Sequence, residues 1–283
     1  MKGNWIFLDG RMIKADTALM NSLEPGVIKG KGVFETMRVR GAEIENLKEH
    51  LGRLDRGLTF FKMRSPYAQE KLKFCLTHTL KANHLQGARV RLAVWRERRR
   101  LRMAIVCRRF EGYPRDKYRK GFNAVVSDIR RLKTRDFHIK SLNYRCFREA
   151  FIKAKAAGYD EAVLLNSRGK IIEGSRTNIF FVQKGTLYTP AVKEGCLNGI
   201  TRQQVIQYAR KAKIPFRAVA ADVRRLFHAD EAFVTNSLMG IMPLTSVGKR
   251  RIGAGSPGPV TRKLLDMYCR KSHSSCPVCD KSV

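Results

Sequence analysis

The sequence predicts an α+β protein with two domains. Its 283 residues suffice for two modest domains, and 43% of them are apolar, enough for a hydrophobic core. Strand-like and helix-like segments mix without the strict alternation typical of a parallel α/β protein. A stretch containing Gly and Pro separates two strand-rich regions. We therefore expect a smaller α/β N-terminal domain at 1–110, a linker at 111–118 and a larger C-terminal domain at 119–283.

Residue periodicity and turn signals predict the individual elements. Alternating or apolar runs predict strands at 5–8, 33–39, 89–95 and 101–106, and another beginning at Phe122. Leucines at 47, 51, 54 and 58 recur with helical spacing. A second helix is expected to start at Ser65-Pro66 and to carry leucines 72, 76 and 80. Two further helices are expected at 147–157, ending at a glycine, and at 201–212, ending before a proline.

The chain is strongly basic. It has 57 Lys and Arg residues but only 24 Asp and Glu residues, which gives a net charge of +33. Such a field attracts polyanions. The basic residues form short clusters along the whole chain, without the concentrated helix or interleaved aromatics of specific nucleic-acid modules. We expect a solvated basic surface and no specific nucleic-acid partner. Apolar runs too short for a membrane span and no signal-peptide pattern predict a soluble, cytoplasmic protein without a membrane partner.

Seven cysteines raise the possibility of a metal site. Cys269, Cys276 and Cys279 form a Cys-x6-Cys-x2-Cys pattern with His273 between them. Structural zinc sites normally pair two Cys-x2-Cys knuckles, and only one is present. We expect no metal and a polar, Cys-containing tail.

Four segments carry residue types suited to chemistry. Lys140 lies at an expected strand end, where partial burial makes an amine a better nucleophile. Glu173 precedes Gly-Ser and a strand. Residues 199–201 begin a helix, whose free N–H groups and dipole suit a phosphate, and the polar turn 235–240 can also offer donors to an anion. Taken singly, each also fits an ordinary role as a solvated lysine, a hairpin, an N-cap or a turn.

The order of these segments resembles the class IV aminotransferase family. That family includes branched-chain aminotransferases, D-amino-acid aminotransferases and 4-amino-4-deoxychorismate lyases. The motifs that carry the resemblance are Gly-Val-Phe-Glu-Thr-Met-Arg at 32–38, His-Leu-Gly-Arg-Leu at 50–54, Lys-Ser-Leu-Asn-Tyr at 140–144, Asp-Glu-Ala-Val-Leu-Leu-Asn at 160–166, Glu-Gly-Ser-Arg-Thr-Asn-Ile at 173–179, Gly-Ile-Thr-Arg at 199–202 and Thr-Asn-Ser at 235–237.

The resemblance implies a two-domain, fold type IV pyridoxal-phosphate enzyme, a homodimer, with the cofactor bound by the C-terminal domain. Lys140 is expected to hold the cofactor as a Schiff base and to move protons at the substrate carbon. Glu173 matches the residue that faces the pyridine nitrogen and keeps it protonated. Tyr144 matches a residue near the phenolic oxygen. The residues expected at the phosphate are Arg53, Gly199, Ile200, Thr201 and Ser237.

The resemblance implies a substrate site less sharply. Its members are expected to be Phe34, the arginines Arg38 and Arg91, and the backbone around Leu238 and Met239. The stretch before Gly-Val-Phe-Glu departs from the family pattern, because Lys29 replaces an aromatic residue that normally lines the pocket. The identity of the small amino-group substrate is therefore open.

Two activities share this cofactor apparatus. The turn Thr-Asn-Ser-Leu-Met and the Arg-Val-Arg-Leu strand resemble the lyase branch, and a dianionic substrate suits a basic pocket. We therefore favour 4-amino-4-deoxychorismate lyase, releasing pyruvate and 4-aminobenzoate, as in folate biosynthesis. The alternative is a branched-chain or D-amino-acid aminotransferase. A remote alternative is an inactive, polyanion-binding protein on the same scaffold.

Overall fold

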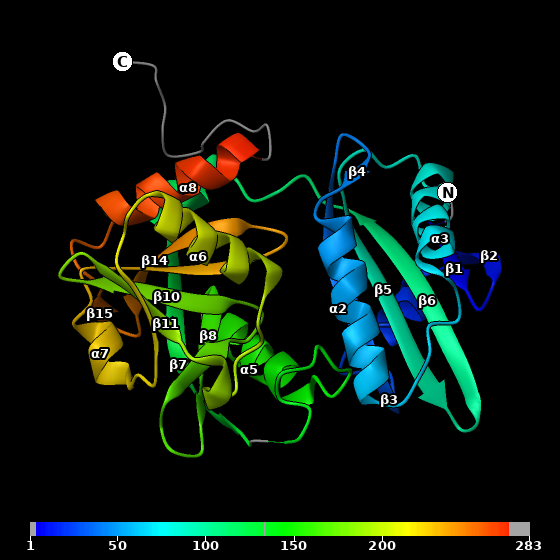
Figure 1. Ribbon diagram of the computed structural model, residues 1–283, viewed down its shortest axis with the longest axis horizontal. Helices are drawn as coiled ribbons and strands as arrows, with labels where there is room; N and C mark the ends of the chain where they lie inside the picture. Colours follow the sequence, from blue (N-terminus) through cyan, green and yellow to red (C-terminus); the bar gives the residue numbers. More distant parts are fainter. Residues whose placement is uncertain (1–3, 133, 272–283) are drawn as a thin grey trace. The chain divides into compact units, whose positions relative to one another are not determined.

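The computed structural model describes residues 4–132 and 134–271 and divides the chain into two compact units. Unit 1 comprises Met1–Gly112 and Ile139–Arg145, and unit 2 comprises Tyr113–His138 and Cys146–Val283. Each unit combines a sheet with helices, so the predicted α+β class is confirmed (Figure 1).

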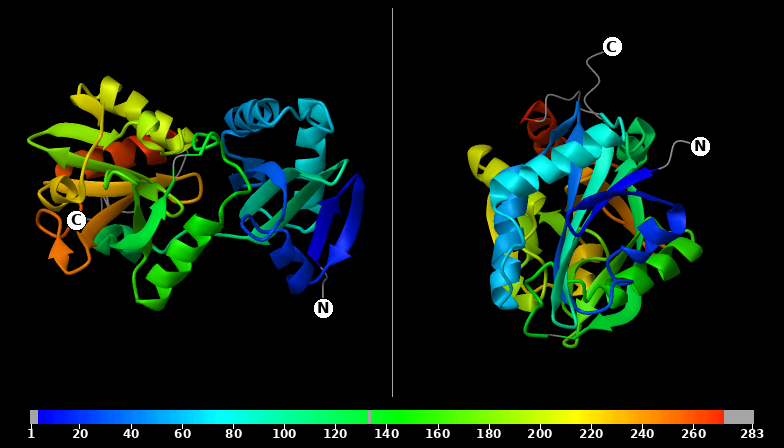
Figure 2. Two further views of the ribbon diagram at one scale, coloured as in Figure 1. Left: turned by 90° about the horizontal axis from the view of Figure 1, so that it is seen from below. Right: turned by 90° about the vertical axis from the view of Figure 1, so that its right-hand side faces the viewer.

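Unit 1 is a six-stranded antiparallel sheet in the order β2-β1-β6-β5-β3-β4. Helices α2 and α3 cover one face, and α1 lies on the other (Figure 2). The bounds are β1 Asn4–Leu8, β2 Arg11–Ala15, α1 Thr17–Ser22, β3 Lys31–Arg40, β4 Glu43–Ile44, α2 Leu47–Phe60, α3 Gln69–Ala82, β5 Ala88–Glu97 and β6 Arg100–Arg109.

The two faces of this sheet follow from the alternation of side chains along each strand. On β3, Val33, Met37 and Val39 point toward α2 and α3 and join one apolar cluster. Phe34 points to the opposite face and joins another. Helix α2 packs closely on β3 because Gly57 has no side chain, and a Cβ there would approach Val33 Cγ1 to 2.8 Å.

The segment Ile139–Arg145 belongs to unit 1, although the sequence analysis assigned it to the C-terminal domain. Its backbone runs beside β3, where the Phe34 amide donates to the Lys140 carbonyl at 3.0 Å and the Leu142 amide donates to the Gly32 carbonyl at 2.9 Å. These bonds satisfy an otherwise open strand edge. The first crossing between the units, after Gly112, falls inside the expected linker, part of which is helix α4.

Unit 2 is built on a nine-stranded mixed sheet in the order β12-β11-β10-β13-β14-β7-β8-β9, with β15 paired to β14. Helices α6 and α8 pack together and against β13. The bounds are α4 Arg115–Lys120, β7 Phe122–Arg131, α5 Arg145–Ala156, β8 Glu161–Asn166, β9 Ile171–Gly174, β10 Asn178–Gln183, β11 Thr186–Pro190, the 3₁₀ turn η1 Val192–Glu194, α6 Ile200–Lys211, β12 Phe216–Val219, α7 Val223–Phe227, β13 Glu231–Asn236, β14 Gly240–Val247, β15 Arg250–Arg251 and α8 Pro259–Lys271.

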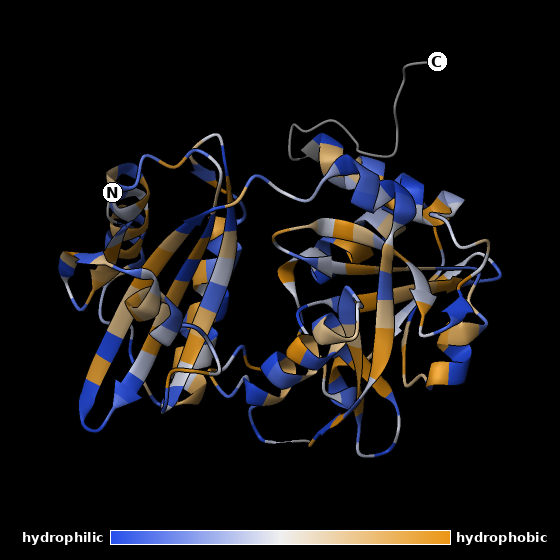
Figure 3. Cartoon of the chain, turned by 180° about the vertical axis from the view of Figure 1, so that it is seen from behind, coloured by the Kyte–Doolittle hydropathy of each residue, from blue (hydrophilic) through white to orange (hydrophobic). Residues whose placement is uncertain are grey.

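The core of unit 2 is apolar and aromatic. Phe180 and Phe233, on the paired strands β10 and β13, stack with ring centroids 5.0 Å apart. Hydrophobic residues concentrate along the strands of both units in Figure 3. Strands β8, β9 and β10 are buried along almost their whole length. The polar side chains at the ends of these strands, described below, are therefore held by rigid elements.

The element predictions agree with the structure except at two places. Lys140 was expected at a strand end, but β7 ends at Arg131 and Lys140 lies in a loop segment that runs beside β3. Ser65-Pro66 was expected to begin α3, but the helix begins at Gln69 after an N-cap at Ala68. The Ser65 hydroxyl instead donates to the Tyr67 carbonyl, forming a separate turn. Among the described residues, no helix is long and apolar enough to cross a membrane. Cys276 and Cys279 lie outside the described residues.

Candidate active site

Lys140 lies beside two aromatic rings of unit 1. Its Nζ is 4.4 Å from the centre of the Phe34 ring and 5.9 Å from that of Tyr144. The two rings meet edge to face at 5.3 Å. The lysine is half-buried, and the edge of β3 fixes its backbone. An amine held against aromatic faces is oriented and partly shielded from water, as covalent chemistry by a lysine requires.

Arg53 is anchored by a carboxylate that the sequence analysis did not select. Arg53 Nε and Nη2 donate to Glu35 Oε1 and Oε2 at 2.8 and 2.6 Å. His50, one helical turn earlier on α2, bonds Glu35 Oε2 through Nδ1 at 2.7 Å. Glu35 and His50 are buried, whereas the Arg53 side chain keeps 12% of its surface exposed. A bidentate pair of this kind fixes the guanidinium plane and so presents Arg53 in one orientation.

This cluster stays charge-balanced despite its burial. Burial acts to raise the pKa of Glu35, but the charge and hydrogen bonds of Arg53, together with His50, outweigh it and hold that pKa at about 2. Burial also lowers the pKa of His50 below 6.5, more than Glu35 raises it. His50 is therefore neutral and donates its Nδ1 hydrogen to Glu35. Its Nε2 has no hydrogen-bond partner within the described residues.

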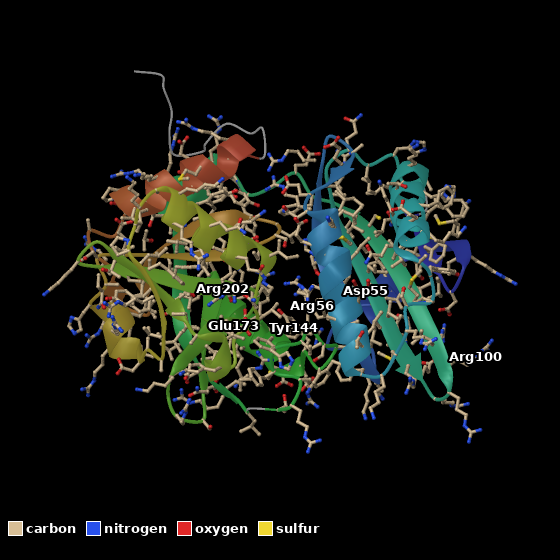
Figure 4. All side chains as sticks on the ribbon, in the orientation of Figure 1. Asp55, Arg56, Arg100, Tyr144, Glu173 and Arg202 are labelled. Carbon is tan, nitrogen blue, oxygen red and sulfur yellow. The ribbon has the colours of Figure 1, made fainter. Side chains whose placement is uncertain are left out.

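In unit 2, Glu173 ends the buried strand β9 and is held from three sides. Arg131 Nη1 donates to Oε1 at 2.7 Å, and the Leu197 amide and Asn178 Nδ2 donate to Oε2 at 3.0 and 3.3 Å. Arg131 is itself fixed by the Gly195 and Phe137 carbonyls. These hydrogen bonds hold the carboxylate in one orientation. Figure 4 labels Glu173 together with Arg202 of α6.

The first turn of α6 has the features of an anion cradle. No side chain caps this helix, so its N–H groups remain available to a ligand. The hydroxyls of Thr201 and Thr235 are buried and have no hydrogen-bond partner in the described part of the chain. Each such orphan costs about 1–3 kcal/mol. A bound phosphate accepts from both kinds of donor, so these residues fit the expected group.

The orphaned hydroxyl of Thr235 lies close to this helix start. Asn178 and Thr235 are direct partners across β10 and β13, so their side chains share one face. A Cβ added at Gly199 would come within 2.2 Å of Asn178 Oδ1. A side chain at position 199 would therefore force the Asn178 amide to move. The expected residues Gly199, Ile200 and Thr201 thus begin a helix beside a second unsatisfied hydroxyl.

The turn after β13 differs from the expected carboxylate-binding turn. The amides of Leu238 and Met239 both donate to Asn236 Oδ1 at 2.9 Å. A substrate carboxylate must share or displace this side chain to use them. Ser237, the expected hydroxyl donor, is half-buried in the same turn.

The two arginines expected at the substrate, Arg38 and Arg91, contact different aromatic rings of unit 1. Arg91 lies 6.0 Å from the Phe34 ring, so it approaches the same ring as Lys140. Arg38 instead packs over Phe110 at 5.8 Å. The expected residues that belong to unit 1 are Phe34, Arg38, Arg53, Arg91, Lys140 and Tyr144, and those that belong to unit 2 are Glu173, Gly199, Ile200, Thr201, Ser237, Leu238 and Met239.

Sequence reasoning missed the residues that position the expected ones. Glu35 had a usable signal, because it occupies the same alternate positions of β3 as Val33 and Met37 and therefore faces the same side of the sheet. His50 had another, because it precedes Arg53 by one turn of the same helix. Arg131 had none, because its pairing with Glu173 joins segments 42 residues apart.

Comparison with known proteins identifies the family of the chain. The amino-transferase class IV family profile matches residues 32–247. A Methanocaldococcus jannaschii protein provisionally named branched-chain-amino-acid aminotransferase is 32% identical over 273 residues, covering 93% of this chain and 94% of the relative. A D-alanine aminotransferase from Staphylococcus haemolyticus is 28% identical over 277 residues, covering 93% and 96%.

The fold agrees as well. The branched-chain aminotransferase of the archaeon Thermoproteus uzoniensis, solved with norvaline, superposes with a TM-score of 0.83 at 31% identity, covering 95% of this chain and 94% of that one. A branched-chain amino acid aminotransferase solved with pyridoxamine 5'-phosphate superposes with a TM-score of 0.84 at 28% identity, covering 95% and 93%. These matches confirm the predicted fold type IV architecture.

The family follows from the extent of these matches. The profile match spans most of the chain and includes the lysine, the carboxylate and the phosphate-cradle residues. This chain belongs to the class IV aminotransferases, which are pyridoxal-phosphate enzymes.

Proposed function

We propose that the chain is an amino-acid aminotransferase that carries its cofactor on Lys140. The observation that carries the proposal is the position of the Lys140 amine, 4.4 Å from Phe34 and on a backbone fixed by β3. The named relatives above are branched-chain and D-alanine aminotransferases, which supports the transaminase alternative over the lyase that the sequence analysis favoured.

In this proposal each residue has a role that follows from its chemistry. Bound pyridoxal phosphate supplies an electron sink for the substrate carbon. The free amides of the first turn of α6 suit the phosphate, and the family resemblance assigns the fixed guanidinium of Arg53 to the same group. The resemblance assigns Glu173 to the ring nitrogen, and Arg131 orients the Glu173 carboxylate for this contact. Lys140 takes and returns the proton at the substrate α-carbon.

The test of this proposal is the site of covalent attachment. Borohydride treatment of the loaded protein, followed by peptide mass spectrometry, should place the cofactor mass on Lys140. Lys140→Ala should lose the attachment and the visible absorbance of the bound cofactor. Lys48→Ala, an exposed lysine on α2, is the matched control and should keep both. Attachment to any other lysine contradicts the proposal.

The same proteins distinguish the two activities. An aminotransferase releases a 2-oxo acid from an amino-acid donor and passes the amino group to an acceptor oxo acid. A lyase releases pyruvate from 4-amino-4-deoxychorismate without an acceptor. We expect Lys140-dependent oxo-acid release from a panel of L- and D-amino acids. Pyruvate release without an acceptor would restore the lyase.

Two expectations about partners stay predictions. The family resemblance predicts a homodimer, and sedimentation of the loaded protein tests it. The scattered basic clusters predict polyanion binding that lacks sequence preference and weakens steeply with salt.

A further inference from the structure

In unit 2, the side chain of Asn178 joins Glu173 to the segment that leads into α6. Asn178 begins β10 and is buried. Its Nδ2 donates to the Leu197 carbonyl at 2.8 Å and to Glu173 Oε2 at 3.3 Å. Because both partners are acceptors, the nitrogen of the amide has to face them, and both of its hydrogens are used. These contacts fix the Asn178 amide in one orientation.

The segment 197–199 extends this connection to the N-cap of α6, which is Gly199. The Leu197 amide donates to Glu173 Oε2 at 3.0 Å. The Leu197 carbonyl accepts from the Gly199 amide at 3.0 Å as well as from Asn178. A Cβ added at Gly199 would come within 2.2 Å of Asn178 Oδ1, so the oxygen of the same amide packs against the N-cap. Asn178 therefore contacts the carboxylate with its nitrogen and the start of the helix with its oxygen.

The opposite end of this segment is held separately. Arg131 donates to Glu173 Oε1 at 2.7 Å and to the Gly195 carbonyl at 2.8 Å. Gly195 lies four residues before the N-cap, whereas Asn178 packs directly against it. Loss of the Asn178 amide would therefore leave Glu173 oriented by Arg131, but would release the N-cap from the strand.

A ligand that uses both Glu173 and the start of α6 depends on the spacing between them. The proposed function places the ring nitrogen of pyridoxal phosphate at Glu173 and its phosphate at the first turn of α6. The size of the cofactor limits the distance between these two groups. A ligand bound at two points gains the full affinity of both only when both are engaged at once. The spacing of the two partners therefore decides how much the phosphate adds to binding.

We propose that Asn178 is a positioning residue that sets the spacing between Glu173 and the N-cap of α6, and that it thereby couples binding at the ring nitrogen to binding at the phosphate. This inference rests on the proposed aminotransferase function, because that function supplies the two-ended cofactor. Without the Asn178 donor, the segment 197–199 shifts against β10. A ligand held at Glu173 then meets the free amides of α6 in poorer geometry.

The test compares pyridoxine 5'-phosphate with pyridoxine in calorimetric titrations of the full-length chain after removal of the cofactor. Both ligands lack the aldehyde that covalent attachment to a lysine requires, and they differ only in the phosphate. We expect the wild type to bind the phosphate form at least about 100-fold more tightly. Asn178→Ala should lower this preference about ten-fold, because pyridoxine uses only the Glu173 end and loses less. The preference is a ratio measured on one preparation, so an unfolded fraction cancels.

Asn178→Asp separates the hydrogen-bond donor from the space that the side chain fills. Aspartate has nearly the same size and keeps an oxygen toward Gly199, but it turns a second oxygen toward Glu173 and the Leu197 carbonyl. We expect it to lose the preference for the phosphate form at least as strongly as Asn178→Ala does. A preference that is lost in Asn178→Ala but kept in Asn178→Asp would show that the side chain only fills space, and it would overturn the inference.

Asn123→Ala is the matched control, because it removes another asparagine of the same unit at the opposite end of β7 from Arg131. Asn123 Oδ1 accepts from the Asp160 amide at 3.0 Å, so this variant also loses a hydrogen bond that joins two segments. It should keep the preference of the wild type. An equal loss of preference in Asn123→Ala and Asn178→Ala would reveal only a general loosening of unit 2, which contradicts the proposed role.

Three further outcomes also decide the inference. A wild type without preference for the phosphate form, an unchanged preference in Asn178→Ala, or an equal weakening of both ligands in that variant would each overturn it. The cofactor-attachment assay distinguishes this failure from failure of the proposed function. A chain that attaches the cofactor to Lys140, but whose ligand preference does not depend on Asn178, fails on the positioning role alone.

Discussion

The two faces of the unit 1 sheet hold a glutamate in opposite ways. On the helix-covered face, Glu35 is almost fully buried and is shared by one arginine and one neutral histidine. On the other face, Glu24 is partly exposed and is shared by three arginines. The first cluster is balanced in charge, and the second is not. We infer that the balanced cluster stabilises the fold and orients Arg53, whereas the partly exposed cluster contributes less to stability.

The two clusters differ in burial and in charge balance, and both properties decide how much an ion pair contributes to stability. A buried pair that leaves no net charge satisfies itself, and removing one partner exposes the desolvation cost of the other. A partly exposed cluster can exchange a lost partner for water or a dissolved anion, so removing one member costs less. Burial and the balance of charge have therefore to be considered together.

The largest expected effect is on stability at the balanced cluster. Glu35→Gln leaves Arg53 and His50 without their carboxylate, and we expect the free energy of unfolding to fall by about 3–5 kcal/mol. Urea unfolding of the full chain at one fixed cofactor concentration measures it. A loss below about 1 kcal/mol would show that Glu35 contributes no more than a surface pair.

The next effect is a dependence on acid. The pKa of Glu35 is about 2 in the folded protein against an ordinary value of 4.5, so the unfolded chain binds a proton first as pH falls. The stabilisation is complete above about pH 4.5 and is lost as pH falls toward 2, for a total of about 3 kcal/mol. The difference between wild type and Glu35→Gln should therefore shrink between about pH 5 and about pH 3. A difference that stays constant across this range contradicts the assigned pKa.

The sequence predicted the parts of this molecule that depend on local pattern. The leucine spacing of α2 is one such part, because the helical period alone decides which side faces the sheet. The motifs around Lys140 and Glu173 are another, because they identify residue types at fixed spacing. The family resemblance then added roles that spacing alone does not give.

The remaining features depend on pairings between distant segments. The chain leaves unit 2 after His138, pairs beside β3 through the segment that carries Lys140, and returns to unit 2 at Cys146, seven residues after Ile139. Nothing in the composition of this segment identifies β3 as its partner. Glu24 and Arg108 lie 84 residues apart in sequence. They come together because the loop after α1 places Glu24 beside strand β6. Their charge excess becomes visible only when the strand register brings the arginines onto one face.

The smallest expected effect separates the two clusters most sharply. Glu24→Gln should change the free energy of unfolding by less than about 1.5 kcal/mol, because its partners are partly exposed and can recruit water or dissolved anions. The change should shrink further as salt is raised to about 0.5 M, since exposed charges are screened, whereas the Glu35→Gln loss should hardly respond. Parallel urea titrations of both variants at low and high salt measure this contrast. If Glu24→Gln proves as costly as Glu35→Gln and equally insensitive to salt, then exposure does not distinguish the two clusters, and Glu24 is as much a structural partner of its arginines as Glu35 is of Arg53.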